Sequence, residues 1–325
     1  MGSRNTTIDL VKYVASMMIV AIHTGLFSDV NETLFFVVVH IVCRQAVPFF
    51  AICTGYFLCR CVEKRKEIFR KQWKKLVILY GVFTGVYLVY SIPMWIEIGW
   101  FSPFAFVDYA IGAVTKGSHY HLWYLWGMIY TLPVFYVLLN TVPERVLPVA
   151  AAVLWVVKSV TYGYAIFIPM SGMLSMLQKL DGFLCLLPLL LSGAVIAGQK
   201  KKTKVFYMLG FAASSLCLMV EAFLLKNAGQ TVFSYIVFTL PAGYFLMQLI
   251  LGINMHVPAA VGRALGQVSM FIYCVHPMIV ELTEDIFRSS IAHFVFTALT
   301  STVLGLMYLF VRKTIDRKKV KLCST

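Results

Sequence analysis

The chain has 325 residues, of which 60% are hydrophobic and only 13% are charged, with a mean hydropathy of +0.82. Soluble globular domains are about 45–50% apolar and about 25% charged, so this composition excludes a water-soluble enzyme. At roughly 20 apolar residues per bilayer crossing, we predict an all-α, polytopic membrane protein of about ten transmembrane helices. That leaves no room for a sizeable soluble domain.

The net charge is +14, from 28 Lys and Arg residues against 14 Asp and Glu residues. In a soluble chain this excess would suggest nucleic acid, but in a polytopic protein the cytoplasmic segments collect positive charge. If the N-terminus is cytoplasmic, most basic residues fall inside, including a basic cytoplasmic loop at 59–75, and Lys158 is among the few outside. We therefore predict that both termini are cytoplasmic and that no nucleic acid is bound.

Ten apolar stretches follow one another along the chain, and each predicts a membrane span. They lie at 9–28, 33–58, 76–97, 120–140, 145–163, 182–198, 205–225, 231–253, 266–287 and 291–312. The segment 98–118 is too short and too polar for a clean span, so we expect an interfacial or re-entrant piece there. No repeat or linker divides the chain, which predicts a single membrane domain over residues 1–325.

The first predicted helix carries an unusual set of polar residues. Asp9, Lys12, Ser16 and His23 fall on one stripe, because Lys12 and His23 are about three helical turns apart. Ionisable side chains are costly in a membrane and usually face the bundle interior, so each one is a functional candidate. His23 lies about 20 Å along the axis from Leu10, in the outer half of a hydrocarbon core roughly 30 Å thick.

The second predicted helix carries His40 and Arg44, one turn apart on one face. Arg44 lies about 15 Å from the outer start of this helix, which matches the depth of His23 to within about one turn. Arginine keeps its charge, whereas histidine exchanges a proton near neutral pH, so the two are a candidate catalytic pair. Structural alternatives stay open: His23 as a structural histidine, Lys12 snorkelling to the interface, and an ion pair of Arg44 with Glu97, Glu221 or Glu281.

The fourth and ninth spans contribute further candidates. The fourth opens with HYHLWYLWGMIY, whose aromatic residues are typical of an interfacial belt. The ninth contains FIYCVHPMIVELTED, where a histidine and a proline in mid-helix indicate either a kink with a structural histidine or a binding site. We predict substrate-binding roles for His121, Tyr124, His276 and Glu281.

Several chemical motifs are absent from the sequence. There is no GxxxxGK[ST] phosphate loop, no HExxH, no CxxC and no GxSxG, so ATP hydrolysis, zinc chemistry and serine hydrolysis have no support. We expect no metal. The cysteines inside the apolar segments are interpreted as small hydrophobic residues, namely Cys43, Cys53, Cys185, Cys217 and Cys274.

Four segments, IDLVKYVASMMIVAIH, RQAVPFFAICTGYFL, HLWYLWGMIY and FIYCVHP, together resemble the membrane acyltransferase-3 family in order and spacing. Members of that family are integral membrane enzymes that typically move an acetyl or other acyl group from cytosolic acyl-CoA to a hydroxyl of an extracytoplasmic glycan, lipid or small molecule. The chain also resembles the membrane domain of the membrane-bound serine racemases of vancomycin-resistant bacteria, which is associated with serine supply.

The resemblance implies roles for three residues. The family's first-helix motif of a basic residue and a histidine falls on Lys12 and His23, and its second-helix arginine falls on Arg44. Lys12 and the basic loop would attract the phosphates of acyl-CoA, His23 would act as general base, and Arg44 would orient the acyl group or stabilise negative charge. The family often has arginine where this chain has Lys12, a point charge in place of a bidentate fork.

Two further readings of the sequence remain open. A transporter of a small polar solute such as serine would use the same buried charges, although no inverted repeat is evident. A non-catalytic scaffold would not need two charged groups at matched depth. The resemblance favours the acyltransferase, in the cytoplasmic membrane of a bacterium, with acyl-CoA, the lipid bilayer and a hydroxyl acceptor as its partners.

Overall fold

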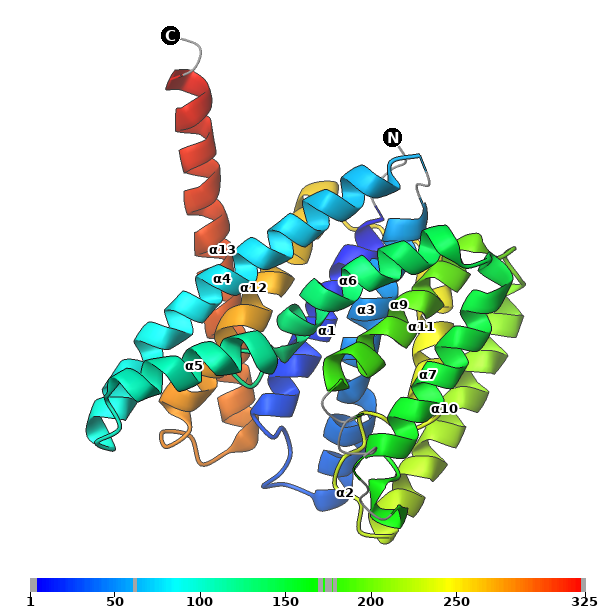
Figure 1. The fold of residues 1–325 in the computed structure, drawn as a ribbon, viewed down its shortest axis with the longest axis horizontal. Helices are drawn as coiled ribbons and strands as arrows, with labels where there is room; N and C mark the ends of the chain where they lie inside the picture. Colours follow the sequence, from blue (N-terminus) through cyan, green and yellow to red (C-terminus); the bar gives the residue numbers. More distant parts are fainter. Residues whose placement is uncertain (1–4, 61–62, 169–171, 173–176, 178–179, 323–325) are drawn as a thin grey trace. The chain divides into compact units, whose positions relative to one another are not determined.

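The structure is a computed structural model that describes residues 5–60, 63–168, 172, 177 and 180–322. Every regular element in this part of the chain is a helix (Figure 1). Eight helical stretches of it are long and apolar enough to cross a membrane, and the helices Pro103–Thr115 and Thr239–Gly252 are shorter and apolar. Each of the ten apolar stretches contains a helix. The prediction of an all-α polytopic membrane protein is confirmed.

The main helical elements follow one another along the chain. They are α1 (Thr6–His23), α2 (Glu32–Phe35), the π-helix η1 (Phe36–Val42), the 3-10 turn η2 (Cys43–Gln45), α3 (Ala46–Arg60), α4 (Arg65–Glu97), α5 (Pro103–Thr115), α6 (Trp123–Thr141), α7 (Leu147–Tyr162), α9 (Asp181–Gly198), α10 (Lys204–Asn227), α11 (Thr239–Gly252), α12 (Ala259–Thr283) and α13 (Ser290–Leu322).

Two compact units are formed from these helices. Unit 1 consists of Met1–Phe50, Lys202–Leu224 and Pro241–Thr325, and unit 2 of Ala51–Lys201 and Leu225–Leu240. Both units are discontinuous in sequence, because the chain leaves unit 1 within α3 and returns to it twice. Each group of functional candidates described below lies within one unit.

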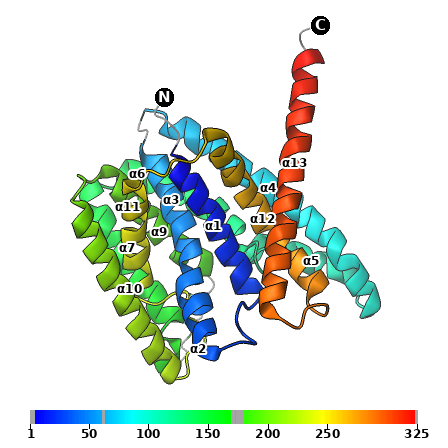
Figure 2. The same cartoon turned by 180° about the vertical axis from the view of Figure 1, so that it is seen from behind.

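Unit 1 is built on α1, α12 and α13, which pack side by side (Figure 2). α1 and α12 run parallel: Asp9 near the start of α1 faces Gly266, and Val20 near its end packs with Ile272. A Cβ at Gly266 would come within 2.6 Å of the Asp9 carboxylate, so the glycine allows the two helices to approach closely. Leu309 of α13 completes the apolar cluster.

Unit 2 is centred on α9, which packs against α6 and α7 and is almost entirely buried. Gly193 of α9 faces α3 so closely that a Cβ there would lie 2.5 Å from the backbone nitrogen of Tyr56. Small residues at such contacts let transmembrane helices approach each other. This contact fixes α9 against α3, and the ends of both helices line the cavity described below.

The basic segment 59–75 is mostly helical, which differs from the loop expected there. α3 ends at Arg60, Cys61 and Val62 lie outside the described residues, and α4 begins at Arg65. Lys, Arg, Glu and Gln are good helix formers, so a charged sequence is compatible with helix outside the membrane. α4 has 33 residues and is therefore about 50 Å long, so its basic first turns extend beyond a hydrocarbon core of roughly 30 Å.

The segment 98–118 contains α5, which packs on α4 (Figure 1). The Tyr80 hydroxyl of α4 donates a hydrogen bond to the Ala113 carbonyl, and the Tyr109 hydroxyl donates to the Thr84 carbonyl at 2.7 Å. With 13 residues, α5 is about 20 Å long, which is too short to cross the hydrocarbon core. Its interfacial or re-entrant placement stays a prediction.

Candidate functional site

His23 is the last residue of α1, which ends earlier than the predicted span 9–28. The Thr24 hydroxyl donates to the Val20 carbonyl at 3.0 Å, and Gly25 adopts a left-handed φ of 61° that an α-helix cannot continue through. The carbonyls at a helix C-terminus favour positive charge. His23 therefore lies at the C-terminal end of α1, next to the carbonyls of its last turn.

The polar stripe predicted for the first helix is present on α1. Asp9 and Ser16 are buried, and Lys12 and His23 are half-buried. The Ser16 hydroxyl donates to the Tyr13 carbonyl at 2.7 Å, so its polar group is satisfied within the helix. Lys12 and His23 are about 16 Å apart along the axis of α1, so we expect them to lie at different depths in the membrane.

His276 of α12 lies directly against His23. The two ring centroids are 5.0 Å apart with an interplanar angle of 44°, and His276 is fully buried. Its Nδ1 is 3.0 Å from the Ile272 carbonyl oxygen. Substrate binding by His276 stays untested, but its contact with His23 is a feature that the sequence did not predict.

Arg44 is carried by an irregular helix. The stretch Glu32–Arg60 is continuous, but it passes through the π-helix η1 and the 3-10 turn η2 before α3 begins. π-helical turns are rare and occur frequently at functional sites. Arg44 is half-buried, with a buried Nε.

The turn that carries Arg44 packs on α1. Cys43, its neighbour in η2, shares an apolar cluster with Ala21 of α1. Ala21 precedes His23 by two positions, so Arg44 and His23 lie at similar depth within unit 1. The structure therefore brings together the elements that carry His23, Arg44 and His276.

The carboxylates considered as alternative partners of Arg44 differ in burial. Glu97 is exposed, Glu221 is buried with 7% of its surface exposed, and Glu281 is half-buried. At about 100° per residue, Glu281 lies about 140° around α12 from His276. Glu281 and His276 therefore do not share one face of the helix, although both were predicted to bind substrate.

His121 and Tyr124 belong to unit 2 and are both buried. The Nδ1 atoms of His119 and His121 are 3.1 Å apart, and Tyr87 stacks on His119 with 4.3 Å between ring centroids. Because a hydrogen bond needs one donor and one acceptor, one Nδ1 carries a proton and the other does not. With 2% of its surface exposed, the His121 side chain is enclosed within unit 2, and its position at the membrane interface stays a prediction.

Lys158, which the sequence places among the few extracytoplasmic cations, has no contact with solvent. It is completely buried in α7, forms an ion pair with Asp181, and places its Nζ 3.3 Å from the ring centroid of Tyr162 and 3.8 Å from that of Tyr235. Tyr162 is one turn after Lys158 in α7, but Asp181 and Tyr235 lie in other segments of the chain, so no local pattern could have indicated them. The ion pair and the two rings offset the desolvation of the ammonium group.

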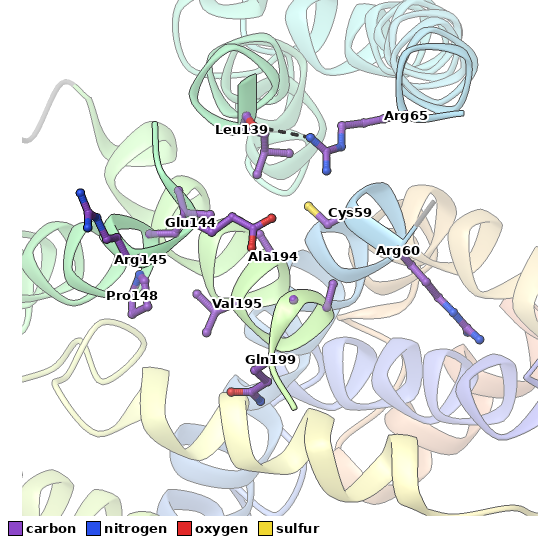
Figure 3. Close-up of a pocket in the computed structure, with 13 residues that line it drawn as sticks. Cys59, Arg60, Arg65, Leu139, Glu144, Arg145, Pro148, Ala194, Val195 and Gln199 are labelled. Carbon is purple, nitrogen blue, oxygen red and sulfur yellow. Dashed lines mark hydrogen bonds between the residues drawn. The ribbon is translucent and has the colours of Figure 1, made fainter. Parts of the chain in front are cut away.

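A cavity of about 400 Å³ lies in unit 2, where the ends of α3, α4, α6, α7 and α9 meet (Figure 3). The side chains of Arg65 and Glu144 point toward its middle, near Cys59, whereas those of Arg60 and Arg145 point outward. Arg65 Nη1 donates to the Leu139 carbonyl at 3.5 Å. The sequence predicts a cytoplasmic position for these segments and for their basic residues, but not the cavity that they form.

Comparison with known proteins adds the family. Residues 5–312 match a family model described as an acyltransferase domain. One relative, an amino-acid racemase from Enterococcus faecalis, is 23% identical over 99% of this chain and 48% of its own length. A second amino-acid racemase from the same organism is 32% identical over 46% of this chain and 21% of its own length.

The chain thus spans about half or less of the length of these relatives. No solved structure matches. The family model covers nearly the whole chain and includes Lys12, His23, Arg44 and His276. With its apolar helices, this match shows that the chain belongs to the membrane acyltransferase-3 family.

Proposed function

We propose that this protein transfers an acyl group, most simply acetyl, from cytosolic acyl-CoA to a hydroxyl of an extracytoplasmic glycan, lipid or small molecule. It acts in the cytoplasmic membrane of a bacterium. The observation that carries the proposal is the packing of three elements in unit 1, which brings His23, His276 and the Arg44 turn to one depth. The family model supports acyl transfer as the reaction class.

In the proposed reaction, His23 takes the proton of the acceptor hydroxyl as the hydroxyl oxygen attacks the thioester carbonyl. Arg44 stabilises the negative charge that develops on the carbonyl oxygen. The intermediate collapses by breaking the carbon–sulfur bond, and the CoA thiolate takes the proton from the His23 imidazolium. The products are an O-acyl ester and free CoA, and His23 is again neutral.

The donor requires a cationic site on the cytoplasmic side, because CoA carries several phosphate charges. The cavity of unit 2 offers such a cation, since Arg65 points toward its middle beside Glu144, while Arg60 and Arg145 at its rim point outward. Arginine is well suited to phosphate because its planar fork donates two parallel hydrogen bonds. Lys12 of unit 1 is a separate cationic candidate, on a segment that the sequence also assigns to the cytoplasmic end of its helix.

Titration calorimetry with CoA on the detergent-purified protein tests the donor site. Arg65→Gln removes one charge-assisted contact, worth about 1.5–3 kcal/mol, and should weaken binding roughly 10- to 100-fold. Arg288→Gln is the matched control, because Arg288 is exposed and lies on a segment predicted to be extracytoplasmic. Equal CoA affinity in the two variants would contradict a donor site in this cavity.

Inverted membrane vesicles test the direction of transfer. Radiolabelled acetyl-CoA added to the exposed cytoplasmic face should yield labelled ester on an acceptor enclosed in the lumen. Label that stays with an acceptor on the same side as acetyl-CoA would contradict transfer across the membrane.

A role with small amino acids is the second candidate, because both relatives are named amino-acid racemases. Serine carries a hydroxyl and therefore also fits the acceptor class of the same chemistry. The acceptor panel should include both enantiomers of serine. Serine uptake by proteoliposomes, in the absence of any CoA binding, would support the transporter in place of the acyltransferase.

A further inference from the structure

The position of His276 in unit 1 indicates a contact within the protein and not a contact with substrate. It is fully buried in α12, and the imidazole of His23 is its neighbour across the α1–α12 contact, with 5.0 Å between ring centroids. This ring contact is not itself a hydrogen bond, and one of the two imidazoles must turn about its side-chain bonds to bring nitrogens of the two rings within hydrogen-bonding distance. The burial of His276 favours contact with His23 over contact with a diffusing acceptor.

The backbone fixes the tautomer of His276. Its Nδ1 is 3.0 Å from the Ile272 carbonyl oxygen, and a carbonyl only accepts hydrogen bonds, so Nδ1 must carry a proton. In the neutral ring the lone pair then belongs to Nε2, which is buried. His276 is thus prepared as a hydrogen-bond acceptor within the protein.

The packing of unit 1 holds the two rings in this arrangement. Ile272, whose carbonyl binds His276, is in the apolar cluster with Val20, one turn before His23 on α1. The same parallel contact continues to Gly266 and Asp9 at the other end. Movement of His276 relative to His23 would therefore require the α1–α12 contact to open.

We propose that His276 is a positioning residue for His23: once the His23 ring turns toward it, the Nε2 of His276 accepts a hydrogen bond from a ring N–H of His23. This leaves the other His23 nitrogen unprotonated and able to take the proton of the acceptor hydroxyl. The logic is that of a base whose tautomer and orientation are set by a third group. The inference rests on the proposed function, since it concerns the residue proposed as base.

Two substitutions separate this role from a structural one. His276→Asn keeps a short amide that can donate to the Ile272 carbonyl but has no acceptor at the position of Nε2. His276→Gln reaches that position with its amide oxygen. A loss of base orientation of this kind costs about 100-fold in rate.

We therefore expect kcat of His276→Asn to fall about 100-fold, and that of His276→Gln to stay within a few-fold of wild type, with the KM for acetyl-CoA unchanged in both. Melting temperatures in detergent should be similar for the two variants. Equal activities of the two variants, or activity that follows melting temperature, would overturn the positioning role.

A second readout does not depend on activity. Nitrogen-15 NMR of histidine-labelled protein in lipid should show His276 with a protonated Nδ1 and an unprotonated Nε2. It should also show that the His23 resonances change in His276→Asn and much less in His276→Gln. A proton on Nε2 of neutral His276 would overturn the inference even if acyl transfer is confirmed. If the spectra are as expected but the protein shows no acyl transfer, the histidine contact is supported and the proposed function is rejected.

Discussion

The close contact between α3 and α9 can be tested by adding one methyl group, with the substitution Gly193→Ala. The new Cβ would lie 2.5 Å from the Tyr56 backbone nitrogen and 2.9 Å from the Gly55 carbonyl carbon, and closer still to the Ile52 carbonyl oxygen. All three atoms belong to the backbone of α3 and cannot rotate away. The helices must therefore separate by about 1 Å to restore normal van der Waals distances.

Such overpacking typically costs about 1–3 kcal/mol, and a 1 Å gap also forfeits up to about half of each dispersion contact along the interface. Because the ends of α3 and α9 line the cavity of unit 2, the separation should also change its walls. We expect Gly193→Ala to unfold at a clearly lower temperature than wild type and to bind CoA more weakly.

Thermal unfolding in detergent, followed by size-exclusion chromatography with fluorescence detection, measures the effect. Gly85→Ala is the matched control, because Gly85 lies in α4 of the same unit and a Cβ there meets nothing within 4 Å. Alanine in an exposed helix position is favoured over glycine by about 1 kcal/mol, so this control should be as stable as wild type or slightly more so. Equal stability of Gly193→Ala and Gly85→Ala would refute the close helix contact.

Three further predictions concern charged groups. Lys158→Ala should destabilise the protein by about 3 kcal/mol, because it leaves Asp181 without its ion pair. The double variant Lys158→Met/Asp181→Asn should be less destabilised in the same unfolding assay. A double variant that is less stable than Lys158→Ala would contradict the buried ion pair. The Ser290 hydroxyl, which donates to Asp29, holds the pKa of Asp29 below its ordinary value of 3.8. A carboxyl pKa that is lower in the folded than in the unfolded protein stabilises the folded state at pH values above the unfolded pKa. This stabilisation by Asp29 should be present at pH 5 and lost as the pH falls through the folded pKa. A Ser290→Ala variant whose melting temperature follows that of wild type from pH 6 to pH 3 would exclude the stabilisation by this hydrogen bond. Arg44→Lys should lower kcat about 10²- to 10³-fold in an acyl-transfer assay, as expected for loss of an oxyanion donor, and an unchanged kcat would remove Arg44 from the mechanism.

The parts of the fold that depend on composition and local periodicity could be predicted from the sequence. Apolar runs are sufficient to place helices, because every spanning segment must satisfy its backbone hydrogen bonds internally. The stripe of α1 was predicted from the spacing of Lys12 and His23; of its four members, Asp9 and Ser16 are buried, and Lys12 and His23 are half-buried. The similar depth of His23 and Arg44 followed from counting residues along two consecutive helices, and the cluster of Ala21 with Cys43 agrees with it.

Features that depend on long-range packing could not be predicted. The contact of His23 with His276 joins residues from the first and ninth predicted spans, and no periodicity within either helix indicates their register. The burial of Lys158 depends on Asp181 and Tyr235, which are remote in sequence. The cavity around Arg65 likewise needs the ends of several helices to be assembled.

Local backbone conformation accounts for the other differences between the predicted and the observed helices. The helix that carries Arg44 contains a π-helical stretch, which regular α-helical counting does not include. α1 ends at His23 because Gly25 and Phe27 adopt left-handed φ values of 61° and 72°, although the apolar character continues to residue 28. For a residue such as Phe27 this conformation is unfavourable, and hydropathy carries no information about it.

The release of free CoA from acetyl-CoA by the detergent-purified protein tests the central claim most directly. The assay uses a mixed panel of hydroxyl acceptors and compares wild type with His23→Ala and with His256→Ala, an exposed histidine of unit 1 that serves as control. We predict acceptor-dependent thiol release by wild type and His256→Ala, and a loss of about 10²- to 10⁴-fold in His23→Ala. Thiol release by a well-folded His23→Ala variant at the wild-type rate would contradict the account.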